Sequence, residues 1–282
     1  MKHIIVTGAK GGTGRSIVDC LRTAGYAVTG IDLEYPTHTD GGYKKVDVLD
    51  GTSLNDLFAN ADAVVHFGSL PTDHWSSWST CFENVMMGGF NVLQAAANTG
   101  ITRIAYASSI EVYGNLNKQP HLPLTEESPQ IPVSIYGSAK LRLEELASDY
   151  CRWHNMSIAG FRLGRIVYEN SYNWRLKSHT ESPDRCVDCL WCYIDARDVA
   201  EACRLWLESD ITGFKAYNLA ADEVCLEVPT ETMLKEFYPN IPVQRKIGKF
   251  QSPFFSTELK MDLGWQAKHH WRDLKIEAET KL

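Results

Sequence analysis

Short apolar runs rich in valine and isoleucine alternate with helical patterns over the first 165 residues, and this alternation constrains the fold most. The runs lie at residues 3–8, 26–32, 44–48, 63–69, 103–109 and 158–164, and helical spacing is found at residues 12–24, 53–59, 77–99 and 134–154. Continuous apolar strands separated by helices are typical of a parallel sheet covered on both faces. We therefore predict a Rossmann-type, doubly wound α/β fold.

The alternation loosens after about residue 165. The pattern there predicts a polar loop at 168–186, a strand at 190–194, a helix at 196–208, a short strand at 215–219 and a helix near 229–237. We interpret residues 1–165 as the main domain and residues 166–282 as a small interleaved lobe. Part of the chain near residues 190–220 is expected to return to the main domain.

Composition excludes several classes of partner. The chain has 282 residues, 44% of them hydrophobic, and a net charge of -7 without a run of Lys or Arg, which argues against nucleic acid and anionic membranes. A small-molecule ligand fits better. The first residues, MKHIIVTG, hold only a short apolar run before a glycine turn, so they predict neither a signal peptide nor a membrane span. We expect a cytoplasmic protein.

Three of the eight cysteines repeat at a spacing of three residues in CVDCLWC, namely Cys186, Cys189 and Cys192. A zinc site needs a fourth ligand, for which His179 is the only near candidate. Because the segment runs into the strand-like LWCYI, we interpret the three as incidental, reduced cysteines and predict no metal.

The first apolar run ends in TGAKGGTG, directly before a predicted helix. Gly8, Gly11 and Gly14 stand at the spacing G-x-x-G-x-x-G, where small residues let backbone amides approach a pyrophosphate at a helix N-terminus. A glycine turn after a strand can also be a tight connection and nothing more. The segment alone therefore leaves two interpretations open.

Asp32 favours the dinucleotide interpretation, because it closes the second apolar run 18 residues after Gly14. A carboxylate there can accept hydrogen bonds from both ribose hydroxyls but repels a 2′-phosphate, and the nearest basic side chain that follows is His38. The sequence therefore predicts NAD rather than NADP. Asp47, at the end of the third run, is either a surface acid or part of an adenine pocket.

Tyr136 and Lys140 lie four residues apart in YGSAK, so a helix places both on one face. A nearby ammonium and a positively charged nicotinamide favour the phenolate, which would bring a tyrosine of ordinary pKa near ~10 towards a useful acid–base range. Ser109 ends the fifth apolar run and can hydrogen-bond the reacting oxygen. This order of residues predicts proton transfer by Ser109, Tyr136 and Lys140.

With these motifs, the chain resembles the extended short-chain dehydrogenases/reductases, the group of nucleotide-sugar epimerases, sugar dehydratases and uronate dehydrogenases, over nearly its whole length. The resemblance implies an NAD(P)-dependent oxidoreductase that acts on a sugar or sugar derivative, and a homodimer paired through residues 77–99 and 134–154. It implies that Asp195 and Asp198, in YIDARDVA, are caps and structural contacts. The cofactor contacts that it implies are Gly8, Gly11, Gly12, Thr13, Gly14, Asp32, Asp47, Val48, Phe67, Gly68, Ser69, Asn84, Tyr136 and Lys140.

Departures from the family pattern narrow the chemistry. The dehydratases carry an Asp-Glu pair after the catalytic Ser or Thr, whereas Ile110-Glu111 stands here, so dehydration loses its acid. The 142 residues after Lys140 are fewer than in typical nucleotide-sugar epimerases. Uronate dehydrogenases share a compact tail, but the Asn-His that follows their serine is also replaced by Ile110-Glu111.

The first candidate substrate residue follows from the same resemblance. Uronate dehydrogenases have a polar loop after R-x-G, here Arg162-Leu163-Gly164, with an arginine that holds the substrate carboxylate. Arg175 is the nearest match, although it can equally be a solvated loop residue. The further candidates are Arg165, His74, Trp75 and Glu111.

Three functions stay open from the sequence. The first is an NAD-linked dehydrogenase of a free sugar or sugar derivative. The second is a nucleotide-sugar 4-epimerase that keeps its NAD bound and forms no net NADH. The third is a dinucleotide-sensing protein without turnover, which the intact Tyr-Lys pair disfavours.

Overall fold

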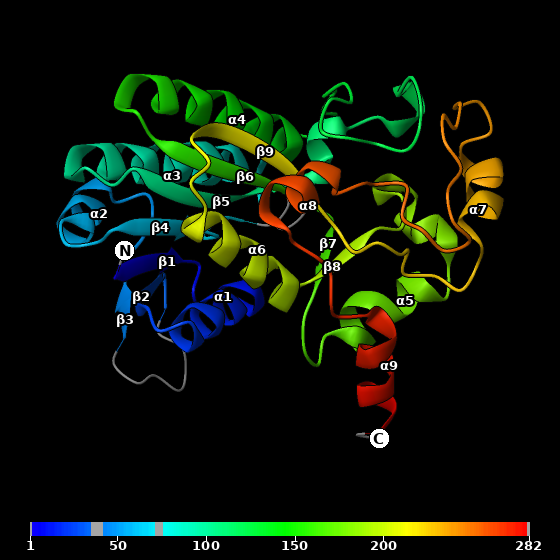
Figure 1. The fold of residues 1–282 in the computed structure, drawn as a ribbon, viewed down its shortest axis with the longest axis horizontal. Coiled ribbons are helices and arrows are strands. Elements are labelled where there is room, and N and C mark those ends of the chain that lie inside the picture. Colours follow the sequence, from blue (N-terminus) through cyan, green and yellow to red (C-terminus); the bar gives the residue numbers. More distant parts are fainter. Residues whose placement is uncertain (1, 35–41, 71–75, 281–282) are drawn as a thin grey trace.

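The computed structural model describes residues 2–34, 42–70 and 76–280 and contains a seven-stranded parallel sheet (Figure 1). The strand order is β3-β2-β1-β4-β5-β6-β9. Successive strands are added towards one edge from β1 to β3 and towards the other edge from β4 to β9, as in doubly wound folds. The predicted fold class is confirmed. The strands are β1 (His3–Thr7), β2 (Ala27–Asp32), β3 (Tyr43–Lys45), β4 (Ala63–His66), β5 (Arg103–Ser109), β6 (Ser157–Leu163) and β9 (Gly213–Leu219).

Helices cover both faces of this sheet (Figure 1). Alternate residues of β1 point to opposite faces, so Ile5 packs in the core under α3 and α4, whereas Ile4 and Val6 pack in the core under α1 and α6. This double burial explains the continuous apolar runs of the strands. The helices are α1 (Gly12–Thr23), α2 (Gly51–Phe58), α3 (Trp78–Thr99), α4 (Ile135–His154) and α6 (Ala196–Glu208).

Short polar side chains set the starts of these helices. Ser77, Ser134 and Asp195 each accept a hydrogen bond from a backbone amide in the first turn of α3, α4 and α6, respectively. The interpretation of Asp195 as a cap is confirmed. Asp50 caps α2 in the same way, so that helix begins at Gly51 rather than at residue 53.

Several elements after β6 gather into a lobe around a second apolar core, to which Trp191, Leu226 and Trp271 contribute, together with Val112 and Leu124 from before β6. The elements of this lobe are β7 (Arg165–Val167), α5 (Lys177–Thr180), β8 (Tyr193–Asp195), α7 (Thr230–Phe237) and α9 (Trp271–Thr280). Helix α8 (Thr257–Leu263) packs instead against the main-domain core through Leu259. Strands β7 and β8 form a separate parallel pair. Between these elements the chain returns to the main sheet through α6 and β9, which pairs with β6.

Three predicted segments need correction. Residues 168–186 are not a polar loop, because Tyr172–Leu176 form a π-helix, α5 follows, and Pro183–Cys189 form 3-10 turns that bury apolar side chains in the lobe core. The strand expected at 190–194 begins only at Tyr193, since Leu190 and Trp191 adopt left-handed backbone conformations in a turn. Strand β3 is shorter than the run at 44–48 and ends at Lys45.

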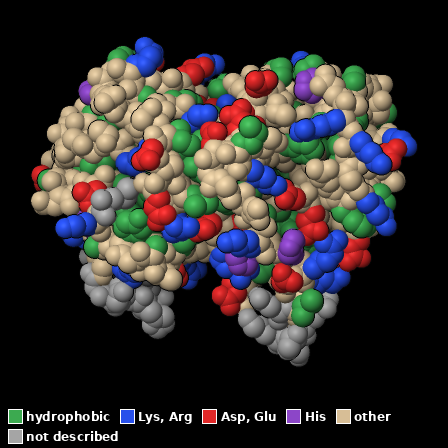
Figure 2. Space-filling view, in the orientation of Figure 1, with side chains coloured by type: hydrophobic (Ala, Val, Ile, Leu, Met, Phe, Trp, Pro, Cys, Tyr) green, Lys and Arg blue, Asp and Glu red, His purple; other side chains and the backbone are tan. Residues whose placement is uncertain are grey.

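The surface carries mixed charge. On the face shown in Figure 2, Lys and Arg side chains are interspersed with Asp and Glu. In the part of the chain that the structure describes, no helix combines the length and apolar character needed to cross a membrane.

A buried ion pair links α4 to β6, the strand beside the edge strand β9. Arg162 on β6 donates to Glu144 on α4 at 2.7 Å, and both side chains are about 5% exposed or less. Arg162 also donates to the hydroxyl of Tyr113 at 2.7 Å, and that hydroxyl donates to Asn218 on β9 at 2.7 Å. The network satisfies a guanidinium that would otherwise be buried without a partner.

We predict that Glu144→Ala lowers the free energy of unfolding by about 3–5 kcal/mol, because it leaves the Arg162 charge buried and uncompensated. Urea denaturation followed by circular dichroism measures this change. Glu145→Ala is the matched control. The Glu145 side chain is 56% exposed and pairs with Arg142 at the surface, so its loss should lower the free energy of unfolding by less than about 1 kcal/mol. Equal losses in the two variants would contradict the buried-pair argument.

Candidate active site

The structure brings Ser109, Tyr136 and Lys140 together where β5 ends and α4 begins. Tyr136 and Lys140 lie on the same face of α4, with the lysine Nζ 5.4 Å from the centre of the tyrosine ring. A hydrogen bond joins the side chains of Ser109 and Tyr136. A cation, a phenol and a hydroxyl therefore share one site.

Lys140 is almost completely buried and makes two hydrogen bonds through its ammonium group. Nζ donates to the carbonyl of Ala107 at 2.8 Å and to Oγ of Ser69 at 3.0 Å. Burial lowers the pKa of Lys140 to about 8, so the ammonium is the major form at neutral pH. The lysine is thus held as a fixed positive charge between the ends of β4 and β5.

The pKa of Tyr136 lies above its ordinary value. Burial raises it most and the Glu111 carboxylate raises it further, while the hydrogen bond to Ser109 lowers it. Among the protein groups, burial and Glu111 thus outweigh Ser109, and the lowered phenol pKa that the sequence led us to expect also requires the bound nicotinamide. A cationic nicotinamide is the further group that would favour the phenolate.

Glu111 is tied to the start of α4. Its carboxylate accepts a hydrogen bond from Oγ of Ser134 at 2.6 Å, and Ser134 is the residue that caps this helix. Glu111 therefore helps to set the orientation of the first turn of α4, which carries Tyr136. The sequence indicated Glu111 as a substrate candidate but did not indicate this structural contact.

Close packing explains the glycines of TGAKGGTG. Gly8 has a left-handed backbone, with φ of 71°, and a Cβ there would lie 2.5 Å from the carbonyl oxygen of Phe67. At Gly14 a Cβ would lie 2.0 Å from the carbonyl oxygen of Gly8. Side chains at these two positions would thus force the turn apart. The cap residue of α1 is Gly11, which offers no side chain to the first-turn amides of Gly12 and Thr13.

Asp32 lies at the end of β2, beside the glycine turn. One carboxylate oxygen accepts from the amide of Lys10 at 2.9 Å, and the other accepts from the amide of Leu33 at 2.8 Å. Each oxygen keeps a second lone pair for a further donor. Asp32 is therefore oriented by the turn that it adjoins.

Two side chains that the sequence analysis passed over hold the ends of β1 and β4 together. Oγ1 of Thr7 is hydrogen-bonded to Nδ1 of His66 at 2.7 Å and accepts a hydrogen bond from the amide of Gly68 at 2.8 Å. Burial, with a smaller effect of Lys140, lowers the pKa of His66 to about 3, so this histidine is neutral at physiological pH. Their positions at the carboxyl ends of adjacent strands were the available signal.

The loop after β4 is anchored to α3. Oδ1 of Asn84 accepts from the amide of Leu70 at 2.7 Å, one residue beyond Ser69. Asp47 is exposed and accepts from the amide of Leu49, while Val48 is buried against Gly88. The candidates His74 and Trp75, as well as His38, lie outside the described residues.

Four buried thiols of the lobe contact one another: Cys186, Cys189, Cys192 and Cys225. Arg165, the reserve substrate candidate, hydrogen-bonds Cys189, and its buried Nε has no hydrogen-bond partner in the part of the chain that the structure describes. Within the described ranges, no group of three or more His, Cys, Asp or Glu side chains is arranged to hold a metal ion.

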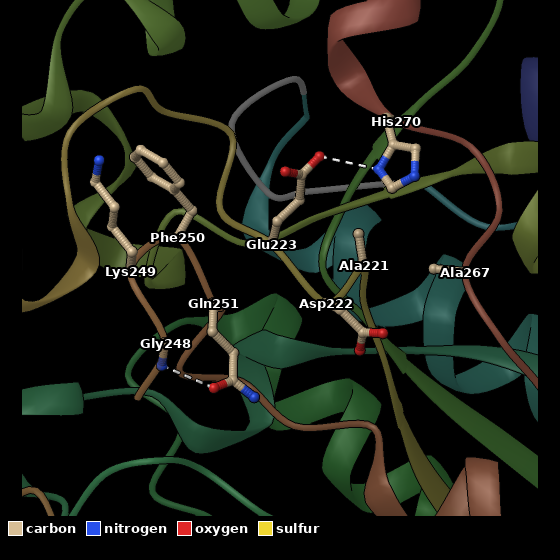
Figure 3. A pocket seen from close by; sticks show the side chains of 9 residues that line it. All are labelled: Ala221, Asp222, Glu223, Gly248, Lys249, Phe250, Gln251, Ala267 and His270. Atoms are coloured by element: carbon tan, nitrogen blue, oxygen red, sulfur yellow. Dashed lines mark hydrogen bonds and ion pairs between the residues drawn. The ribbon is translucent and has the colours of Figure 1, made fainter. Parts of the chain in front are cut away.

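A cavity of about 280 Å³ lies elsewhere in the lobe (Figure 3). Its lining includes Asp222, Glu223, Lys249 and His270. The carboxylate of Glu223 is hydrogen-bonded to Nδ1 of His270 at 3.1 Å. None of its lining residues belongs to the glycine turn or to the Ser109, Tyr136 and Lys140 group. We therefore place the chemistry at the strand ends of the main domain.

A comparison with family models finds a match of residues 4–180 to the "NAD dependent epimerase/dehydratase family". The chain belongs to this family. The matched residues include the glycine turn, Asp32 and the Ser109, Tyr136 and Lys140 group, and NAD is the cofactor of the family.

Curated relatives of this epimerase/dehydratase family member are sugar enzymes. A uronate dehydrogenase of Pseudomonas putida is 27% identical over 169 residues, which cover 57% of this chain and 60% of the relative. An L-arabinose 1-dehydrogenase (NAD(P)(+)) of Haloferax volcanii is 29% identical, covering 83% of this chain and 94% of the relative. The chain thus spans less than two thirds of the first relative and almost all of the second.

Solved structures of the same fold cover nearly the whole chain. A short-chain dehydrogenase/reductase superfamily protein from Agrobacterium tumefaciens with bound NAD has a TM-score of 0.75 at 25% identity, covering 99% of this chain and 96% of that protein. A UDP-glucose 4-epimerase from Thermotoga maritima with UDP-glucose has the same TM-score at 19% identity, covering 99% and 100%. The second likeness shows the fold alone.

The residues of this chain fit an NAD cofactor. The glycine turn leaves no room for a Cβ at Gly8 or Gly14, the cap of α1 adds no side chain, and the first turn of α1 contains no acidic residue. Such a helix start attracts phosphate. Asp32, at the end of β2, offers the carboxylate that a ribose diol would meet.

We predict that Asp32→Ala weakens NAD⁺ binding about tenfold and reduces the ratio of the affinity for NAD⁺ to that for NADP⁺. The reason is that the carboxylate that accepts from the ribose and repels a 2′-phosphate is removed. Isothermal titration of both cofactors measures this. Glu34→Ala is the control, an exposed acid two residues away that pairs with Lys10. Equal affinity of the wild type for both cofactors would contradict the electrostatic argument.

Proposed function

We propose that this protein is an NAD-linked dehydrogenase that oxidises a secondary alcohol or hemiacetal of a free sugar or sugar derivative. The observation that carries the proposal is the contact of Ser109, Tyr136 and the buried Lys140 at the strand ends beside the glycine turn. This arrangement offers a proton acceptor, a hydrogen-bond donor and a fixed cation around one reacting oxygen.

The proton path runs through Tyr136. In the oxidation, the ionised phenol takes the proton of the substrate hydroxyl, while Ser109 orients the reacting oxygen through a hydrogen bond. Lys140 stabilises the phenolate by its charge, and its bonds to Ala107 and Ser69 keep that charge in place. NAD, when bound, supplies the hydride acceptor. Because burial and Glu111 raise the pKa of Tyr136, activity in the oxidative direction should rise with pH.

Two relatives support the substrate class. The L-arabinose 1-dehydrogenase matches over 94% of its length, and the other relative is named as a dehydrogenase of uronate. We propose that residues 166–282 supply the substrate lobe and that the protein serves carbohydrate metabolism. An epimerase is the second candidate, because a UDP-arabinose 4-epimerase of Arabidopsis thaliana matches 99% of this chain at 23% identity.

An absorbance screen for NADH over L-arabinose, uronates and UDP-sugars separates the candidates. Net NADH from a free sugar supports the dehydrogenase, whereas isomerisation of a UDP-sugar without net NADH supports the epimerase. Binding of NAD⁺ without turnover of any sugar supports the sensing protein.

On the substrate found, we predict that Tyr136→Phe lowers kcat at least about a thousandfold and leaves the Kd for NAD⁺ nearly unchanged, since only the proton acceptor is lost. Lys140→Ala should lower kcat and also raise the Kd for NAD⁺. Steady-state rates and calorimetric titration measure the two effects. Tyr106→Phe is the control, a buried tyrosine whose hydroxyl has no hydrogen-bond partner among the described residues. A Tyr136→Phe enzyme of normal rate would refute the mechanism.

We propose a homodimer formed through α3 and α4. Large apolar side chains are exposed on both helices, with Trp78 73%, Phe82 46% and Trp153 59% exposed, and a partner would cover them. Light scattering should give twice the chain mass of 31.7 kDa, and the mass of a single chain would refute the dimer.

We also propose a cytoplasmic location. The eight free cysteines suit a reducing cytoplasm, which cell fractionation tests.

A further inference from the structure

A tyrosine of the lobe lies directly on the glycine turn. Tyr168 follows the last residue of β7, and a Cβ at Gly12 would lie only 2.7–2.8 Å from three atoms of its ring. Gly12 is the first residue of α1, whose first backbone amides would face the pyrophosphate of a bound dinucleotide. The contact therefore joins the chain after β7 to the cofactor end of the main domain, two segments that are distant in sequence (Figure 1).

A tight turn brings Arg175 back to this tyrosine. The amide of Tyr168 donates to Oγ of the fully buried Ser171 at 2.9 Å, and the amide of Arg175 donates to the Ser171 carbonyl at 2.9 Å. Nε of Arg175 donates to the carbonyl of Ile166 at 2.6 Å. The Arg175 guanidinium is also hydrogen-bonded to Tyr168 and lies 5.8 Å from its ring centre. Arg175 is thus held in place by these contacts, and its side chain is partly buried.

The charge of Arg175 has no acidic partner among the residues that the structure describes. The groups that act on its pKa are burial first, then Tyr168 and the nearby cation of Arg165, and no carboxylate is among them. A partly buried guanidinium next to Tyr168, without a carboxylate partner in the described part of the chain, favours an anionic ligand. Arg165 differs in this respect, because Asp188 acts on its charge.

We propose that Tyr168 and Arg175 form a clamp over the cofactor site, in which Arg175 binds the pyrophosphate and Tyr168 packs on Gly12 to hold the glycine turn. The clamp rests on the proposed function in taking NAD as the cofactor. It differs from the role expected of Arg175 by family resemblance, which was to hold a substrate carboxylate. A guanidinium fork matches phosphate oxygens as well as a carboxylate, so binding measurements must separate the two roles.

ADP-ribose separates them, because it keeps the pyrophosphate and lacks the nicotinamide beside which a substrate would bind. Isothermal titration should show that Arg175→Gln raises the Kd of both NAD⁺ and ADP-ribose at least about tenfold, the usual effect of losing one charge-assisted hydrogen bond. Arg175→Lys should recover part of the affinity, since the charge is kept. Lys177→Gln is the matched control, an exposed cation two residues away, and should leave both Kd values unchanged.

Gly12→Ala gives a second, independent measurement. The added methyl group would collide with the Tyr168 ring, so we expect weaker ADP-ribose binding in the wild-type background and a smaller loss in the Tyr168→Ala background. Equal losses in the two backgrounds would show that the ring does not hold the turn. Thermal melting of each variant confirms that it is folded.

The outcomes distinguish the two proposals. If the wild type binds neither NAD⁺ nor ADP-ribose, the proposed function fails. If the wild type binds both and folded Arg175→Gln binds ADP-ribose equally well, the clamp is wrong. A normal ADP-ribose Kd together with a raised KM for the sugar would return Arg175 to the substrate site.

Discussion

The buried ammonium of Lys140 is the group around which the site is arranged. An ammonium removed from water needs hydrogen-bond acceptors, and here they are the Ala107 carbonyl on β5 and the Ser69 hydroxyl after β4. The loop that carries Ser69 is held in turn by Asn84 of α3, which accepts from Leu70. One charge therefore couples two strand ends and two helices, and it places the tyrosine one helical turn before it at the same edge.

The surroundings of this charge also determine the acid–base properties of the site. The low polarity that lowers the pKa of Lys140 raises the pKa of Tyr136, because burial disfavours whichever form is charged. Glu111 adds to the effect on Tyr136, while Ser109 opposes it. The protein groups alone thus favour a neutral phenol beside a cationic lysine. A cationic nicotinamide would favour the phenolate, which links proton transfer to the state of the cofactor.

The cofactor end is built by two different kinds of contact. The inner wall leaves no room for side chains, because a Cβ at Gly14 would meet the carbonyl oxygen of Gly8 within the turn, and a Cβ at Gly8 would meet that of Phe67 after β4. The outer wall is distant in sequence, since Tyr168 reaches Gly12 from beyond β7. A segment that the sequence pattern presents as a polar loop is instead folded by buried Tyr172 and Leu176 into the π-helix that carries Arg175.

The sequence by itself determined the doubly wound sheet, the glycine turn, Asp32 and the Ser109, Tyr136 and Lys140 group. These follow from apolar periodicity and from spacings within single elements, which depend on local geometry. Only the tertiary structure decided the hydrogen bonds of Lys140, the pairing of Thr7 with His66, the raised pKa of Tyr136 and the contact of Tyr168 with Gly12. Each of these depends on burial or on groups brought together by packing, and periodicity along a single chain records neither.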